Sequence, residues 1–491
     1  MTPDLSTPTT AARPPRFAVV VLAFVGIVVS LMQTLVVPLI PQLPSLLHTT
    51  ATDASWIITA TLLAGAVVMP IAGRLGDMFG KRRMLVISLA LLVVGSVFSA
   101  LTSSLGMMLA GRILQGLAMG AIPLGISILR DVLPREKVGP AVAAMSASMG
   151  VGGAIGLPVS ALIAQNADWH VLFWAAAGLG VVSLVLVATI LPESPVRTPS
   201  RFDFVGALGL AAGLIALLLP ITKGASWGWT SPLTLGLFAA AALILVLWGI
   251  LELRLASPLV DLRVSARPRV LFTNLASIAV GVAMYGMSLS FPQLLMAPTS
   301  TGYGLGLTMV QAGLAMAPGG IVMMLLSPVS ARLTARRGPK TTLIIGAVVI
   351  GAGYVLAFFL IDAVWQIVAA SMVIGAGIGL AYAAMPALIM GAVPPTETGA
   401  ANGLNALMRS VGTSVSAAVM GMILANMTMS FGSVTVPSLA GFHVTFAVAI
   451  GSAAAALVLA ALIPRSRSAV EEPPTNGTSS RSARRRVSSA A

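Results

Sequence analysis

The stretch Gly73-Arg74-Leu75-Gly76-Asp77-Met78-Phe79-Gly80-Lys81-Arg82-Arg83 joins two long apolar runs, near residues 55–73 and 84–104. Two apolar runs with so short a connection predict a tight hairpin in a membrane, and its three glycines permit close backbone approach and turns. Asp77 is the one acid among four basic residues, and basic residues mark the cytoplasmic side. We interpret the stretch as a cytoplasmic gate element, with candidate gate residues Gly73, Arg74, Asp77, Gly80, Lys81 and Arg82.

The composition around this stretch indicates an all-α integral membrane protein. Of 491 residues, 57% are hydrophobic and 9% are charged, whereas a soluble domain carries roughly 25% charged residues. Cysteine is absent, so neither disulfides nor thiolate chemistry are available. Three histidines lie far apart at His48, His170 and His443, so we expect no metal site and no cofactor.

The apolar runs predict about fourteen membrane spans, because a span needs ~20 apolar residues. We place them near 17–40, 55–73, 84–104, 106–129, 139–164, 170–191, 204–223, 232–253, 270–295, 307–329, 341–361, 364–390, 398–427 and 442–463. All Lys and Arg residues except Lys223, Arg112 and Arg409 fall in connections on one side. This asymmetry predicts a multi-pass cell-membrane protein with both termini in the cytoplasm. It also explains the net charge of +14 without nucleic acid.

An internal repeat divides the chain. Residues 331–340 overlay residues 73–82 with Arg-Leu and a later Gly in place, but Ala335 replaces Asp77. Parallel repeats are typical of transporters, whose binding site lies between the halves. We therefore expect a disordered cytoplasmic N-terminus at 1–16, a six-helix bundle at 17–191, a linker with two extra, peripheral spans at 192–268, a second six-helix bundle at 269–463 and a disordered basic cytoplasmic tail at 464–491.

Polar residues within the spans are candidates for a substrate cavity. Gln33 and Thr34 interrupt the first span, where cavity lining and helix packing are equally open readings. Asn402, Asn405 and Arg409 share one face of span thirteen. Arg409 either lines the cavity or extends its charge to the nearby cytoplasmic end.

Spans four and five carry two further candidate groups. Arg112 is costly within a span, and Gln115 shares its face; with Gly116 and Arg409 these residues are candidates for coupling or cavity lining. The alternative is an Arg112 that reaches the outer interface. In span five, Gly152 and Gly156 permit close helix contact and Pro158 favours a bend, so this helix is a candidate hinge or a tight packing face.

With these residues in hand, the chain resembles the major facilitator superfamily, and within it the fourteen-helix drug:proton antiporter branch of multidrug efflux proteins. Residues 73–83 are similar to the family's loop motif Gly-x-Leu-Ala-Asp-Arg-x-Gly-Arg-Lys. Residues 109–120 resemble its fourth-helix motif, with Arg112, Gln115 and Gly116 in place. Residues 312–319 and 291–293 resemble a second-half segment. The resemblance implies two six-helix bundles with two extra helices between them, and export of amphipathic compounds driven by protons.

Three departures from the family pattern stand out. The helix-five motif is degraded around Pro158, and Trp169-His170-Val171 replaces Trp-Arg-Trp. The usual carboxylate of the first helix is replaced by Met32. No Asp or Glu lies near the middle of a predicted span, which leaves Asp53, Asp168 and His170 as the nearest groups for proton coupling. A cationic substrate would lack a buried counter-charge, so we expect neutral, zwitterionic or anionic substrates.

We therefore expect a monomeric secondary transporter, not an enzyme, that exports small molecules by alternating access and is driven by protons. Asp77 is predicted to close the cytoplasmic side by meeting the start of span thirteen near Thr398, where the helix dipole favours negative charge. One alternative is an uncoupled facilitator or importer on the same fold. A remote one is a membrane receptor or enzyme, for which no clustered nucleophile, metal ligands or long loop is available.

Overall fold

A computed structural model describes residues 15–40, 42–431 and 434–464 of the protein. The expectations for residues 1–14 and 465–491 lie outside this range, and α1 begins at Pro15, two residues before the expected span. The elements run in the order α1 Pro15–Thr34, η1 Val37–Leu39, α2 Leu43–Leu46, α3 Ala51–Ala54, α4 Trp56–Phe79, α5 Lys81–Ala100, α6 Leu105–Leu117, η2 Ala118–Gly120, α7 Ala121–Val132, α8 Arg135–Asn166, α9 His170–Ile190, α10 Phe204–Trp227, α11 Pro232–Arg254, α12 Leu262–Ser265, α13 Pro268–Met296, η3 Thr299–Thr301, α14 Met309–Leu325, α15 Ser327–Arg337, α16 Pro339–Phe359, α17 Val364–Met390, η4 Pro395–Glu397, α18 Thr398–Asn426, β1 Thr428–Phe431, β2 Val434–Pro437 and α19 Leu439–Leu462.

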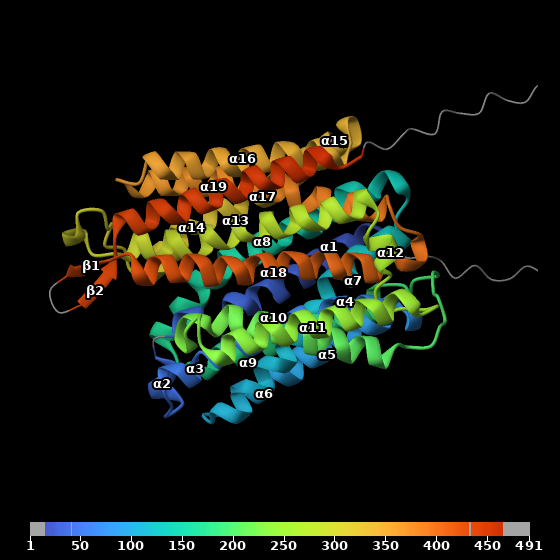
Figure 1. Ribbon diagram of the computed structural model, residues 1–491, viewed down its shortest axis with the longest axis horizontal. Helices are drawn as coiled ribbons and strands as arrows, with labels where there is room; N and C mark the ends of the chain where they lie inside the picture. The colour runs from blue at the N-terminus through green and yellow to red at the C-terminus, as the bar shows by residue number, and fades with distance from the viewer. Residues whose placement is uncertain (1–14, 41, 432–433, 465–491) are drawn as a thin grey trace, which may run out of the picture.

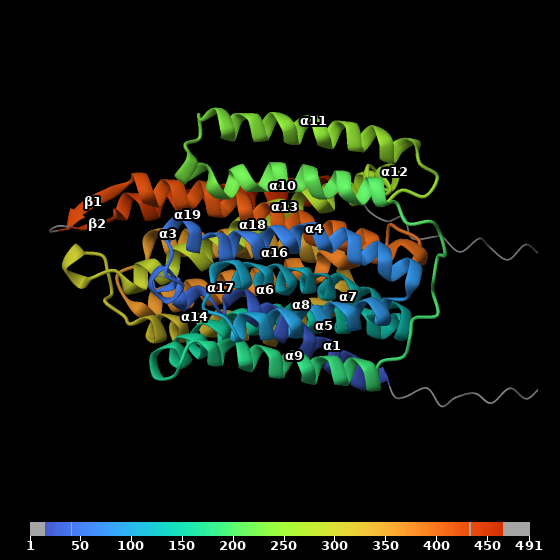
Figure 2. The same ribbon diagram turned by 90° about the horizontal axis from the view of Figure 1, so that it is seen from below.

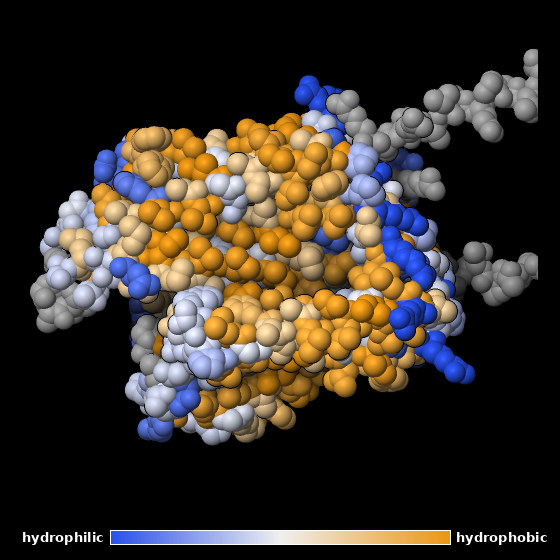
Figure 3. Space-filling view, in the orientation of Figure 1, coloured by the Kyte–Doolittle hydropathy of each residue, from blue (hydrophilic) through white to orange (hydrophobic). Residues whose placement is uncertain are grey.

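The expected all-α membrane architecture is confirmed. Among the described residues, fourteen helical segments are long and apolar enough to cross a membrane. Figure 3 shows an apolar band across the molecule with hydrophilic residues gathered at its two ends. An apolar band of this kind fits the hydrocarbon core of a bilayer. An antiparallel hairpin of β1 and β2, which pairs Thr428 with Pro437, extends beyond one end and was not predicted.

The helices form two halves with separate cores. One core is built from residues between 276 and 463, and two others are built almost wholly from residues between 18 and 191. In Figure 1, α16, α17 and α19 lie on one side of the molecule, α5, α6 and α9 on the other, and α18 between them. The halves meet where α4 packs against α18 and α8 packs against α14. The candidate gate therefore lies at an interface between halves.

The two extra helices differ in their packing. Helix α11 lies at the outer edge and touches the rest mainly through α10 (Figure 2), and few of its residues are buried. Helix α10 packs against both α4 and α18, through a cluster that includes Leu210, Leu214 and Leu407. The expectation that both extra spans are peripheral is therefore wrong for α10, which bridges the two halves.

The connection at residues 73–83 is the tight hairpin that the sequence predicted, and it is almost entirely helical. Helix α4 continues to Phe79 and α5 begins at Lys81, so Gly80 alone makes the turn, with a φ of 110° that favours glycine. The equivalent stretch of the second half has the same construction, because α15 ends at Arg337 and Gly338 turns with a φ of 80°. Both turns leave basic side chains on the ends of rigid helices.

Candidate functional site at the interface between the halves

Asp77, near the end of α4, joins the two halves. Its Oδ1 accepts a hydrogen bond from the backbone N–H of Gly399 at 3.0 Å, and its Oδ2 accepts one from Ala400 at 2.9 Å. Both donors belong to the first turn of α18, where backbone N–H groups lack helical partners and the dipole favours an anion. The contact that the sequence predicted near Thr398 is present, and the carboxyl group is almost fully buried.

Glycines allow the two helices to approach this closely. A Cβ atom at Gly73 would overlap the carbonyl oxygen of Gly399, and one at Gly399 would overlap that of Gly73. One turn further along, a Cβ atom at Gly403 would overlap the carbonyl oxygen of Met69. The backbones of α4 and α18 are thus in direct contact, which brings the first-turn N–H groups within reach of a short Asp side chain.

A fully buried lysine extends this contact into a network. Lys81 Nζ lies 2.6 Å from Asp131 Oδ2 at the end of α7 and 3.4 Å from Asp77 Oδ1. It also donates to Thr398 Oγ1 at 3.1 Å. Because a buried cation is tolerated only when it is paired, the two carboxylates stabilise the lysine and the lysine helps to hold Asp77 in position. We call Asp77, Lys81, Asp131 and Thr398 the latch network.

Asp131 was missed by the sequence reasoning. It follows Arg130 at the predicted cytoplasmic end of span four, so a basic connection containing a second acid was a visible signal. The pairing itself depends on the packing of α5 against α7, which joins residues 50 positions apart.

The linker after α9 forms hydrogen bonds with residues of the latch network. The Thr198 N–H donates to the Asp77 carbonyl at 2.8 Å, and its hydroxyl donates to the Thr396 carbonyl at 3.3 Å. Ser194 donates to Asp131 Oδ2 at 2.5 Å. These hydrogen bonds tie the linker to both halves.

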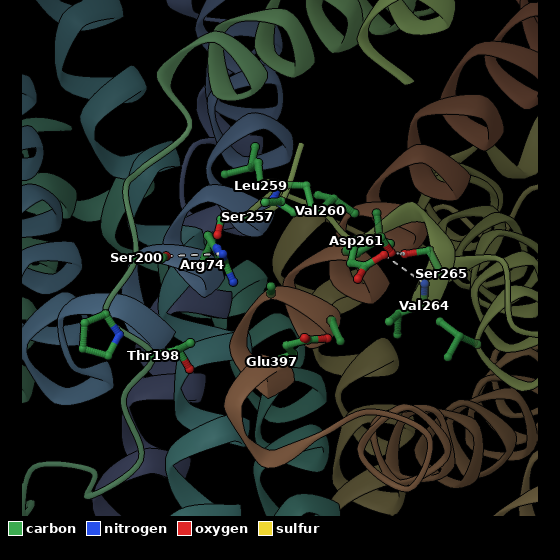
Figure 4. A pocket seen from close by; sticks show the side chains of 17 residues that line it. Arg74, Thr198, Ser200, Ser257, Leu259, Val260, Asp261, Val264, Ser265 and Glu397 are labelled. Carbon is green, nitrogen blue, oxygen red and sulfur yellow. Dashed lines mark hydrogen bonds between the residues drawn. The ribbon is translucent and has the colours of Figure 1, made fainter. Parts of the chain in front are cut away.

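The other gate candidates contact this linker as well. Glu193 accepts from the Arg82 N–H at 3.1 Å, and it leaves no room for a side chain at Gly80. Arg74 donates to Ser200 at 3.5 Å and lines a cavity of about 250 Å³ between the linker segments and α18. Figure 4 shows Arg74, Thr198 and Ser200 on one side of this cavity and Asp261 on the other.

Arg112 and Gln115 lie inside the N-terminal half. Arg112 Nη1 donates to Gln115 Oε1 at 2.6 Å, and Gln115 Nε2 donates to Ser96 of α5 at 2.9 Å. Arg112 is 2% exposed, so it does not reach the interface with water. Gly116 packs against the backbone of α4 at Thr61. The structure brings these residues together, and cavity lining by them stays a prediction.

The polar face of α18 turns toward its own half. Arg409 Nη1 donates to Asn405 Oδ1 at 2.7 Å, and the guanidinium carbon lies 5.0 Å from the ring centroid of Tyr382. Asn405 in turn donates to Asn274 of α13 at 2.9 Å. Arg409 is 7% exposed, which excludes the reading that it extends to the membrane surface in this conformation. Asn402 donates to the Thr398 carbonyl at 2.9 Å.

The remaining candidates lie at contacts of α8. Gly152 and Gly156 pack against α1 at Ile27 and Thr34, whose hydroxyl donates to the Leu31 carbonyl. Gln33 is partly buried. Pro158 instead lies against Gly313 of α14, at the second contact between the halves. Helix α8 is continuous through Pro158, and a hinge there stays a prediction.

Acidic groups within the described spans lie near span ends. Asp77 and Asp131 belong to the latch network, and Glu252 is buried at the end of α11. On the opposite face, the backbone N–H and the ring of His170 hold the pKa of the exposed Asp168 below its usual range, so Asp168 stays ionised near neutral pH. No group of three or more metal-ligating side chains occurs among residues 15–40, 42–431 and 434–464.

The comparisons with known proteins agree with this geometry. The model of the family described as Major Facilitator Superfamily matches residues 22–417 and 275–489. The chain belongs to the major facilitator superfamily. The proton:xylose symporter XylE, a member of that superfamily, has the same fold, with a TM-score of 0.66 at 15% identity over 92% of this chain and 96% of that one.

Two curated relatives are similar over much of the chain. The tetracenomycin C resistance and export protein of Streptomyces glaucescens is 29% identical over 86% of this chain and 78% of its own. The uncharacterized MFS-type transporter YhcA of Bacillus subtilis is 26% identical over 69% of this chain, and the match spans 63% of its length. The superfamily transports small molecules across membranes.

Proposed function

We propose that this protein exports small amphipathic compounds from the cytoplasm across the cell membrane by alternating access. The observation that carries the proposal is the latch network. Asp77 on one half holds the first turn of α18 on the other, so the contact has to break when the halves separate at this end. Such a contact stabilises the closed state and so shifts the equilibrium between the two alternating states toward it. The similarity to an export protein supports the outward direction of transport.

Protons are the proposed driving ion, as the antiporter resemblance implies, and the chain works as a monomer with both termini in the cytoplasm. The even number of candidate spans supports termini on one side, and the basic connections support the cytoplasmic side.

The substrates are neutral, zwitterionic or anionic. Arg112 and Arg409 are the buried charges nearest the middle of the described spans, and neither has a carboxylate among its recorded partners.

Transport in proteoliposomes tests the proposal. The purified chain is reconstituted, and a panel of anionic, neutral and cationic amphipathic dyes is offered with and without an imposed pH gradient. We expect transport of anionic or neutral dyes to accelerate when the gradient drives protons opposite to the dye. Transport that ignores the gradient indicates a facilitator, and acceleration only when dye and protons move together indicates an importer.

A further inference from the structure

A second cavity, of about 250 Å³, lies at the cytoplasmic end of the C-terminal half, away from the latch network. It is formed where α13 begins, α15 turns into α16 and α19 ends (Figure 1). Three of its lining residues are the cations Arg269, Arg337 and Lys340, and none is acidic. The cavity therefore concentrates positive charge in a small volume.

These cations have no counter-ion within the described chain. Within residues 15–40, 42–431 and 434–464, none of the three forms an ion pair with an acidic side chain. Arg269 carries a buried Nε without a hydrogen-bond partner. Lys340 Nζ donates to the carbonyls of Ala461 and Ile463 at 2.8 and 2.6 Å, which fixes its position but leaves its charge uncompensated. An anion would satisfy both the orphaned donor and the charge.

The backbone adds to the attraction for an anion. Helix α16 begins at Pro339, and Gly338, Pro339 and Thr341 all line the cavity. The first turn of a 21-residue helix presents unpaired N–H groups and the positive end of its dipole. The planar guanidinium groups beside such a turn can each donate two parallel hydrogen bonds to a pair of phosphate oxygens.

The surroundings favour a phosphate that is attached to a lipid. Ile344 and Leu388 form apolar walls of the cavity. Beside it, Leu271 is 40% exposed and Leu462 is 54% exposed on the membrane surface of the helices. We propose that this cavity binds the phosphate headgroup of an anionic phospholipid from the cytoplasmic leaflet, with the acyl chains against these leucines. Basic pockets between membrane helices on this side are suited to such headgroups.

Bound lipid contacts three segments that line this cavity. It neutralises the repulsion between the three cations and ties the α15–α16 turn to the start of α13 and the end of α19. The inference does not depend on which compound is transported.

Native mass spectrometry of the full chain in detergent tests this site, by titrating phosphatidylglycerol and, in separate arms, phosphatidylcholine and inorganic phosphate. We expect saturable binding of phosphatidylglycerol that phosphatidylcholine does not reproduce. The double variant Arg269→Gln with Arg337→Gln removes both guanidinium groups that line the cavity. We expect it to weaken lipid binding roughly thirtyfold, because each basic group near the surface contributes about fivefold to the affinity.

The matched control changes the charge equally but outside the cavity. Arg332→Gln with Arg336→Gln alters two exposed residues of the same α15 region, and we expect less than about a threefold effect. Arg337→Lys retains the charge but not the paired donors, so we expect affinity between that of the parent and that of Arg337→Gln, which separates loss of binding from misfolding. Equal weakening in both double variants, or equal binding of phosphatidylcholine, overturns the proposal. Tight binding of inorganic phosphate that phosphatidylglycerol does not displace also overturns it, because the ligand would then be a free anion.

Discussion

Replacing Asp77 with asparagine tests the latch directly. Each carboxylate oxygen accepts one N–H from the first turn of α18, whereas an asparagine amide has a single acceptor oxygen. One donor therefore loses its partner, and the favourable interaction of a negative charge with the helix dipole disappears. A hydrogen bond to a charged group contributes about 1.5–3 kcal/mol and the dipole adds about 0.3–1 kcal/mol. The cytoplasm-closed state should lose about 2–4 kcal/mol relative to the open state.

The charges that remain in the Asp77→Asn variant add no further cost to this free energy. Lys81 keeps Asp131 at 2.6 Å, so the variant does not leave an unpaired buried cation. A loss of about 2–4 kcal/mol changes the ratio of closed to open molecules roughly 30- to 1000-fold.

Thiol labelling measures this shift without background, because the chain has no cysteine. Ala406 is 3% exposed and packs against Met69 and Met119 of the other half, so a cysteine there reacts when the cytoplasmic side opens. We expect Asp77→Asn to raise the rate of maleimide labelling of Ala406→Cys from the cytoplasmic side at least tenfold, and to slow efflux. Asp362→Asn, at an exposed position on the opposite face, is the control. Labelling and efflux equal to the parent in Asp77→Asn would refute the latch.

Three further changes probe neighbouring contacts. Gly73→Ala places a methyl group against the backbone of α18 and should prevent cytoplasmic closure, whereas Gly106→Ala, with open space around it, should leave transport unchanged; efflux assays of both compare them. Asp131→Asn replaces the charged partner of Lys81 at 2.6 Å with a neutral amide, while Asp77 remains 3.4 Å away. It should cost about 1.5–3 kcal/mol of stability, visible as a lower unfolding temperature that a normal melting curve would contradict. Lys223→Met removes a cation 4.5 Å from the Trp56 ring and its bond to α3–α4, and should reduce stability by about 1–2 kcal/mol with efflux retained, measured by thermal unfolding and transport together.

The candidate site shows where sequence reasoning succeeds and where it stops. The contact between Asp77 and the start of α18 could be predicted, because an acid in a basic connection needs a positive partner and a helix start supplies one. The partners of Lys81 and the binding of the linker at Thr198 could not, because each bond joins residues from separate segments. The shared face of Arg112 and Gln115 follows from their spacing in one helix, whereas the bond from Gln115 to Ser96 joins two helices and could not be predicted.

Hydropathy and charge are properties of the chain itself, so the sequence alone determined the membrane class, the fourteen spans and the repeated halves. Close helix contacts depend instead on which faces meet. Only the tertiary structure decided that Gly73 would lie against Gly399, that α10 would bridge both halves, and that the turns at Gly80 and Gly338 would end rigid helices. The physical reason is that apolar side chains are interchangeable toward lipid, whereas a backbone contact or a buried ion pair requires one particular partner.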